Sequence, residues 1–109
     1  MSKIRVLIVE DDPIICEDIR DMVSNVEYDA IAVAHTKTEA INYIDKLLPD
    51  LVLLDINLEG NYEGIDVANY INKKYKIPFL YLTSYSGKEI LEKAKKTTPM
   101  GYVLSLIHI

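Results

Sequence analysis

The sequence has few of the residues on which disulfide-rich and metal-thiolate proteins depend. Its 109 residues include one cysteine, Cys16, two histidines, His35 and His108, and no tryptophan. A single cysteine excludes an internal disulfide framework, and the two isolated histidines do not complete a zinc-binding pattern. Glycine and proline occur four times each, so no Gly- or Pro-rich linker divides the chain. We therefore assign no chemistry to Cys16, His35 or His108.

Long apolar runs and an excess of basic residues are also missing. No apolar stretch approaches the roughly 20 residues that a transmembrane helix needs, and residues 1–3 lead directly into a predicted strand, without room for a signal peptide. Twelve basic residues stand against 17 acidic ones, and the lysines are spread over several predicted helices, which argues against a nucleic-acid surface. We predict a cytoplasmic domain away from membranes and nucleic acids, with proteins as its partners.

Strand and helix patterns alternate along the whole chain, in a length that suits one domain. The predicted strands are residues 4–9, 30–34, 51–54, 79–83 and a last one from residue 102. Four predicted helices connect them, and the connections are short. Alternation of this kind, with right-handed crossovers, predicts a doubly wound α/β fold with a five-stranded parallel sheet, in the order (βα)4β.

Local signals mark where the first two helices begin. Pro13 opens the first helix, and Thr36 with Glu39 forms the capping box S/T-x-x-E at the start of the second. Pro49 ends the second helix. Helical spacing predicts that the following side chains are buried: Ile15, Ile19, Met22 and Val23 on the first helix, and Ala40, Ile44, Leu47 and Leu48 on the second.

Acidic residues follow two of the predicted strands. Glu10, Asp11 and Asp12 come after the first strand, and Asp55 comes after the third. The carboxyl ends of parallel strands meet at one edge of a sheet, so these acids should lie together. Gathered carboxylates repel one another unless a divalent cation that prefers oxygen ligands joins them, which predicts a magnesium site. Asp12 precedes Pro13, so it fits the role of a helix cap better.

Three short motifs close predicted strands, and a fourth lies on the last predicted strand. They are Val9-Glu10-Asp11, Leu53-Leu54-Asp55-Ile56-Asn57, Leu82-Thr83-Ser84 and Gly101-Tyr102-Val103. In this order and spacing, the chain resembles the receiver domain of two-component response regulators, which has a flavodoxin-like fold. The resemblance covers residues 1–104, which we take as the domain.

The resemblance assigns roles to the residues of these motifs. It implies that Asp55 is the phosphoacceptor, fed by a sensor histidine kinase or a phosphotransfer protein. It implies a Mg²⁺ ion held by Glu10, Asp11, Asp55 and Asn57, with Asp11 as a direct ligand, Glu10 acting through water and Asn57 through its backbone carbonyl. It also implies that Thr83 and Tyr102 form a switch pair, whose signal leaves along the fourth helix and fifth strand.

The chain departs from the family pattern after Leu104. The family has a lysine three residues after the strand-five aromatic, then a proline and a fifth helix, whereas Ser105 stands here at the lysine position. A charged hydrogen bond contributes about 1.5 to 3 kcal/mol, so its loss should weaken stabilisation of the phosphorylated state. We interpret residues 105–109 as an atypical or non-native tail. Without the fifth helix, we expect an open apolar patch on one sheet face, covered by the tail or by self-association.

Three functional hypotheses are compatible with the sequence to different degrees. The leading hypothesis is a phosphoaspartate signalling switch, which assists its own phosphorylation without being an enzyme in the usual sense. A pseudo-receiver, which binds partners without phosphorylation, is favoured by Ser105 and opposed by the intact acidic residues. An aspartyl-phosphate phosphatase would need a second aspartate two residues after the nucleophile, where Asn57 stands. No glycine-rich loop follows the first strand, so nucleotide binding has no support.

Overall fold

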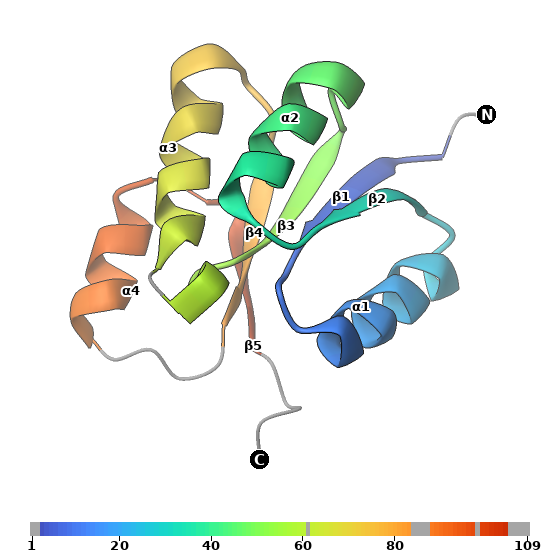
Figure 1. Ribbon diagram of the computed structural model, residues 1–109, viewed down its shortest axis with the longest axis horizontal. Coiled ribbons are helices and arrows are strands. Elements are labelled where there is room, and N and C mark those ends of the chain that lie inside the picture. The colour runs from blue at the N-terminus through green and yellow to red at the C-terminus, as the bar shows by residue number, and fades with distance from the viewer. Residues whose placement is uncertain (1–2, 61, 84–87, 98, 105–109) are drawn as a thin grey trace.

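The computed structural model describes residues 3–60, 62–83, 88–97 and 99–104. Its five strands are β1 (Arg5–Val9), β2 (Asp29–Ala34), β3 (Leu51–Asp55), β4 (Phe79–Thr83) and β5 (Gly101–Leu104). They form one sheet in the order β2-β1-β3-β4-β5, and every neighbouring pair is parallel (Figure 1). The predicted five-stranded, doubly wound α/β fold is therefore confirmed.

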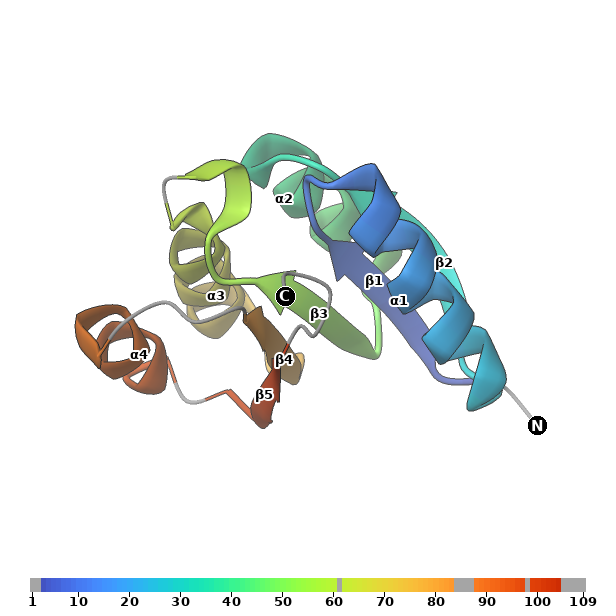
Figure 2. The same ribbon diagram turned by 90° about the horizontal axis from the view of Figure 1, so that it is seen from below.

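Helices cover both faces of the sheet, unequally. The helix α1 (Pro13–Asn25) lies on one face, and α2 (Lys37–Leu47), α3 (Glu63–Lys74) and α4 (Lys88–Lys95) lie on the other (Figure 2). The strands alternate accordingly: Val6 and Ile8 of β1 join the cluster under α1, whereas Leu7 and Val9 join the larger cluster on the opposite side. Within the described residues, no helix is long and apolar enough to cross a membrane.

The first helix begins as predicted, but its buried side is rotated. Asp12 Oδ1 accepts hydrogen bonds from the backbone N–H groups of the first turn, at 2.9 Å from Ile14 and 3.4 Å from Ile15, so Asp12 is the N-cap. Met22, predicted to be buried, is 55% exposed. Cys16 is buried in its place, because the stripe of buried side chains turns toward the end of β1.

The second helix corrects two predictions. Thr36 Oγ1 accepts from the Glu39 N–H at 3.1 Å, as a capping box requires, but Glu39 Oε1 accepts from the His35 N–H at 2.8 Å, one residue before the expected donor. Leu48 is 53% exposed rather than buried, because the helix ends at Leu47 and Leu48 adopts a left-handed conformation with φ 46°.

The sheet face under α1 carries apolar side chains of β3 and β4 that are largely buried. Leu53 and Leu82 are only 9% and 6% exposed, and Leu51 and Leu80 are partly buried against the same cluster. These described residues are largely covered in the structure, so they do not decide whether the face is open, and the expected patch stays a prediction. The predictions that the tail covers this face or that molecules associate through it depend on residues 105–109, which lie outside the described residues.

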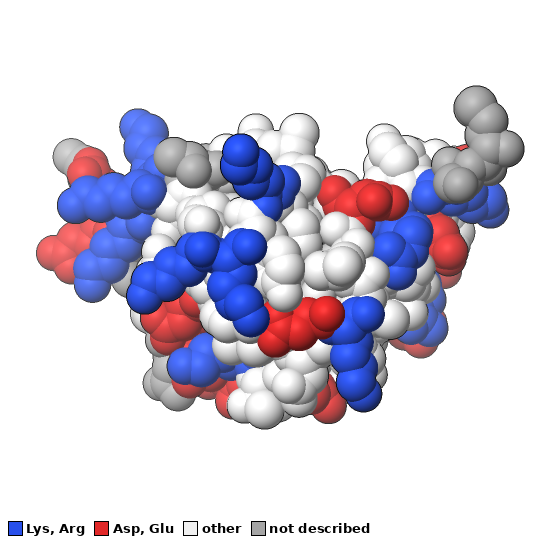
Figure 3. Space-filling view, turned by 90° about the horizontal axis from the view of Figure 1, so that it is seen from above, with Lys and Arg blue, Asp and Glu red and all other residues white. Residues whose placement is uncertain are grey.

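The sequence suggested that the lysines are spread over the helices, but in the structure many of them gather at one end of the molecule (Figure 3). Asn72 Nδ2 of α3 donates to the Thr97 carbonyl at 2.7 Å, so the ends of α3 and α4 lie side by side. Lys and Arg side chains gather over these two helices at the left of Figure 3, with some acids among them. The exposed lysines of this end are Lys73, Lys74, Lys76, Lys93, Lys95 and Lys96.

Candidate functional site

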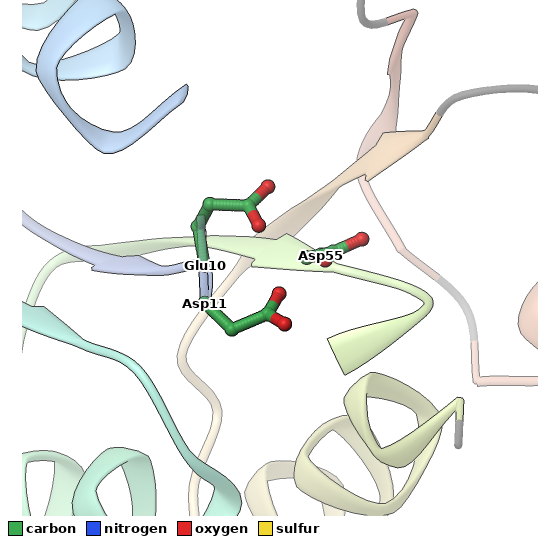
Figure 4. Close-up of side chains that lie close together, drawn as sticks. All are labelled: Glu10, Asp11 and Asp55. Atoms are coloured by element: carbon green, nitrogen blue, oxygen red, sulfur yellow. The ribbon is translucent and has the colours of Figure 1, made fainter. Parts of the chain in front are cut away.

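Three carboxylates meet at the carboxyl edge of the sheet. Glu10 and Asp11 follow β1, Asp55 ends β3, and these two strands are neighbours, with Val9 paired to Leu54. One carboxylate oxygen from each acid lies within 4.8 Å of the others (Figure 4). The sequence prediction that these acids come together is confirmed, and Asp12 is turned instead to the start of α1.

Burial makes this concentration of negative charge costly. Glu10 is 5% exposed and Asp55 is half-buried, whereas Asp11 is exposed. Burial, followed by the charge of Asp55, raises the pKa of Glu10 to about 8. Burial also raises the pKa of Asp55, against the lowering effect of the Asn57 N–H. Near neutral pH, the cluster therefore retains a proton unless a cation balances its charge.

The donor set fits a hard divalent cation. The three side chains supply oxygen ligands only, from two strands that hold them in fixed relation, and Mg²⁺ prefers one or two carboxylates with water in its remaining positions. Exposed Asp11 leaves the cluster open to solvent on one side. These residues thus fit Mg²⁺ better than a soft transition metal.

Hydrogen bonds hold the Glu10 N–H, its carbonyl oxygen and its Oε2. Its N–H donates to the Ala34 carbonyl at 2.9 Å, and its Oε2 accepts from the Asp12 N–H at 3.1 Å. Its own carbonyl oxygen lies 3.0 Å from His35 Nδ1 and 3.2 Å from Cys16 Sγ. No motif assigned chemistry to Cys16 or His35, so sequence reasoning missed both. The usable signal was position, because His35 directly follows β2 as Glu10 directly follows β1.

The loop after β3 is built from tight hydrogen bonds. Asp55 Oδ1 accepts from the Asn57 N–H at 3.0 Å, and Asn57 Oδ1 accepts from the Tyr62 N–H at 3.3 Å. The Asn57 carbonyl, expected to bind the metal, accepts from the Gly60 N–H at 3.0 Å. A carbonyl has a second lone pair, so this bond is compatible with metal binding, which stays a prediction for Asn57.

Backbone conformation in this loop is unusual. Glu59 and Tyr62 have φ values of 58° and 57°, in the left-handed region that non-glycine residues rarely adopt. Such conformations cluster at functional sites. Gly64, in the first turn of α3, lies directly against the Asp55 backbone and is another residue that sequence reasoning missed.

The two predicted switch residues are placed by their backbones. Asp55 pairs with Leu82, so Thr83 lies one residue beyond it on the neighbouring strand. Tyr102 of β5 pairs with Tyr81 of β4. Their side chains belong to the part of the chain that the structure does not describe, so the switch role stays a prediction.

This strand order, with an acidic cluster at the carboxyl ends of the neighbouring strands β1 and β3, defines a flavodoxin-like α/β domain with its site at the topological switch point. The sequence model for the response regulator receiver domain matches residues 6–105. The chain therefore belongs to the response regulator receiver domains of two-component systems, as its motifs suggested.

Individual proteins agree with this assignment. The chain is 35% identical over 81 residues to the phyllosphere-induced regulator PhyR of Methylorubrum extorquens, covering 73% of this chain and 30% of that protein. It is 32% identical over 100 residues to the transcriptional regulatory protein PdtaR of Mycobacterium tuberculosis, covering 92% and 48%. The chain thus spans half or less of these relatives.

A solved structure shows the same fold. The signal receiver domain of a modulated diguanylate cyclase from Desulfovibrio desulfuricans G20 superposes with a TM-score of 0.86 at 30% identity, covering 94% of this chain and 81% of that chain. The five-stranded sheet and its helices are therefore those of a receiver domain.

Proposed function

We propose that this domain is a phosphoacceptor switch, in which Asp55 takes a phosphoryl group from a sensor histidine kinase or a phosphotransfer protein. The observation that carries the proposal is the meeting of Glu10, Asp11 and Asp55 within 4.8 Å at the carboxyl edge of the sheet. Glu10, Asp11, Asp55 and the Asn57 carbonyl would hold Mg²⁺.

The reaction requires a positioned carboxylate. The Asp55 carboxylate attacks phosphorus, the bond from phosphorus to the donor's nitrogen breaks, and an aspartyl phosphate forms. The Asn57 N–H, 3.0 Å from Oδ1, fixes the orientation of the attacking group. Bound Mg²⁺ would supply positive charge to balance the phosphoryl oxygens and the acids.

The new phosphoryl group would be bound by a residue of the neighbouring strand β4. Thr83 lies one residue past the position that pairs with Asp55, and its hydroxyl would donate to a phosphoryl oxygen. Tyr102 on β5 would fill the space that Thr83 leaves. Buried Tyr81 connects β4 to the end of α4, because its hydroxyl lies 2.7 Å from Thr97 Oγ1. This contact supports the part of the proposed signal route that leads from β4 to α4.

Intact mass spectrometry tests the proposal directly. The protein is incubated with a small acyl phosphate, with Mg²⁺ or with a chelator. We expect the mass of one added phosphoryl group only with Mg²⁺, its loss in Asp55→Asn, and its retention in Asp18→Asn, which changes an exposed carboxylate of α1 outside the cluster.

Failure of the wild type to gain this mass at high donor concentration would contradict the proposal. It would favour a pseudo-receiver that binds partners without phosphorylation, consistent with Ser105 at the position of the family lysine. A mass gain that persists in Asp55→Asn would show that another group is the acceptor.

A further inference from the structure

The acceptors and donors around Glu10 point to a role for two residues outside the acidic cluster. We propose that His35 and Cys16 are positioning residues, which hold the peptide group between Glu10 and Asp11 and thereby set the affinity of the site for Mg²⁺. This inference rests on the proposed function, because it concerns the same metal site.

Both donors converge on one oxygen. His35 Nδ1 lies 3.0 Å and Cys16 Sγ 3.2 Å from the Glu10 carbonyl oxygen, and the two donor atoms are 4.0 Å apart. A carbonyl oxygen accepts two hydrogen bonds, so these donors fill its capacity. Since the oxygen can only accept, the His35 tautomer must carry its hydrogen on Nδ1.

The Glu10 carbonyl oxygen lies where its hydrogen bonds can orient two of the acidic side chains. The Glu10 carbonyl belongs to the peptide unit that joins Glu10 to Asp11, so its orientation sets the direction in which both side chains leave the backbone. The two cluster acids after β1 are therefore fixed together by one pair of hydrogen bonds. Rotation of this peptide would move both carboxylates relative to Asp55.

His35 is itself anchored, although its side chain is exposed. Its N–H donates to Glu39 Oε1 at 2.8 Å, which ties it to the first turn of α2. Its place beside Glu10 depends on a register shift in the β1–β2 pair, where Val6 pairs with Ala30 but Leu7 with Ala32. Without this extra residue, Ala34 rather than His35 would come opposite Glu10.

The surroundings of His35 and Cys16 leave room to substitute either residue. A hollow of about 250 Å³ lies beside the imidazole and the thiol, between α1 and β2. Side chains of similar or smaller size at these positions therefore do not overpack the core. The conservative variants are His35→Asn, whose amide nitrogen takes the place of Nδ1, and Cys16→Ser. The matching variants without a donor are His35→Leu and Cys16→Ala.

Magnesium titration, followed by backbone amide signals in NMR, tests the role. We expect His35→Leu to weaken Mg²⁺ binding about tenfold, the lower end of the effect of removing an outer partner of a metal site. His35→Asn should restore most of the affinity, and Cys16→Ser should bind more tightly than Cys16→Ala. Thr38→Ala, an exposed change on α2, serves as the control and should bind like the wild type.

A second readout needs no metal. The Asp11 N–H belongs to the peptide held by His35, so its amide signal should shift in His35→Leu and return toward the wild-type position in His35→Asn. Equal affinities, or equal losses, in His35→Leu and His35→Asn would overturn the inference. If the wild type itself binds no Mg²⁺, the proposed function fails, and the Asp11 signal alone decides whether His35 positions the peptide.

Discussion

Gly64 and Asp55 are in direct backbone contact. A Cβ atom on Gly64 would lie 1.9 Å from the Asp55 carbonyl oxygen and 2.8 Å from its carbonyl carbon, closer than real Cβ atoms approach. The first turn of α3 therefore packs onto the end of β3 with no side chain between them. Gly60 differs, since nothing lies within 4 Å of its Cβ position and only its φ of 75° favours glycine.

Gly64→Ala should displace either α3 or Asp55. Overpacking of this kind typically costs about 1 to 3 kcal/mol of unfolding free energy, and here the displaced atoms belong to Asp55, the proposed phosphoacceptor. We expect lower stability in urea unfolding and slower phosphorylation by an acyl phosphate. Gly60→Ala is the comparison, because its left-handed strain costs about 1 to 2 kcal/mol without a clash at Asp55. Equal phosphorylation rates in the two variants would contradict the contact's functional importance.

Asp11 and Asp12 are adjacent in sequence but should respond differently to alanine substitution. Asp11 belongs to the carboxylate cluster, so Asp11→Ala should remove most Mg²⁺ binding. Asp12 caps α1, so Asp12→Ala should cost about 1 kcal/mol of stability and leave Mg²⁺ affinity nearly unchanged. Magnesium titration and urea unfolding of both variants separate the two roles. Similar losses of affinity would show that the assignment of the two acids is wrong.

The sequence predicted the elements and the acidic edge for a definite reason. Strand and helix periods are local, and parallel strands bring their carboxyl ends together whatever the details of packing, so Glu10, Asp11 and Asp55 could be placed without coordinates. The rotation of α1 that exposes Met22 beside buried Cys16 was not predictable in this way. Both residues border the apolar stripe of α1, and only packing against the sheet decides between them.

Contacts between different helices and strands could not be predicted from local sequence patterns. His35 is 25 residues from Glu10, and it reaches Glu10 only because the β1–β2 register shifts by one residue. A shift of this kind leaves no mark in the hydrophobic pattern of β2, whose residues Ala30, Ala32 and Val33 are all small and apolar. The close approach of Gly64 to Asp55 likewise depends on how α3 docks on β3.

Tyr81→Phe should weaken the connection between β4 and the end of α4. Tyr81 is fully buried, and its hydroxyl lies 2.7 Å from Thr97 Oγ1. Removing the hydroxyl should lower the unfolding free energy by about 1 kcal/mol, the usual contribution of a hydrogen bond. Tyr28→Phe is the control, since Tyr28 is 36% exposed. The same small change in both variants on urea unfolding would show that the buried contact does not stabilise the fold.

Asp45 should make the protein more sensitive to acid. It accepts hydrogen bonds from the Tyr75 hydroxyl at 2.6 Å and the Tyr70 hydroxyl at 2.7 Å, with Lys74 Nζ at 3.6 Å, and these contacts join α2 to α3 and its C-cap. They lower the pKa of Asp45, the Tyr75 bond most. Because the pKa of Asp45 is lower in the folded state, Asp45 stabilises the folded state at pH values above its pKa in the unfolded chain. This stabilisation is lost as the pH falls through its pKa in the folded state.

Asp45→Asn should therefore be less stable than the wild type at neutral pH, and the difference should shrink on acidification. Chemical unfolding at neutral pH and at about pH 3 measures it, with Asp21→Asn, an exposed change on α1, as the control. A difference that is the same at both pH values would mean that the charge of Asp45 does not contribute.

Glu10 should produce the opposite pH dependence. Its pKa is raised from 4.5 to about 8, chiefly by burial and next by the charge of Asp55. Between these values the folded state keeps a proton that the unfolded state has lost, so, without a divalent cation, stability should fall as the pH rises from about 4.5 to about 8. The raised pKa of Asp55 acts in the same direction.

Glu10→Gln removes the titrating group but keeps an oxygen that can accept from the Asp12 N–H. In a chelating buffer, the variant should lose much of this slope and be more stable than the wild type at about pH 8, because it no longer places a second charge beside Asp55. Urea unfolding at about pH 5 and about pH 8 measures both effects. Mg²⁺ should stabilise the wild type at the higher pH and the variant less, since a bound cation offsets the repulsion that the substitution has already removed. A variant that is less stable than the wild type at high pH, or that keeps the full slope, would show that charge repulsion at Glu10 does not govern this site.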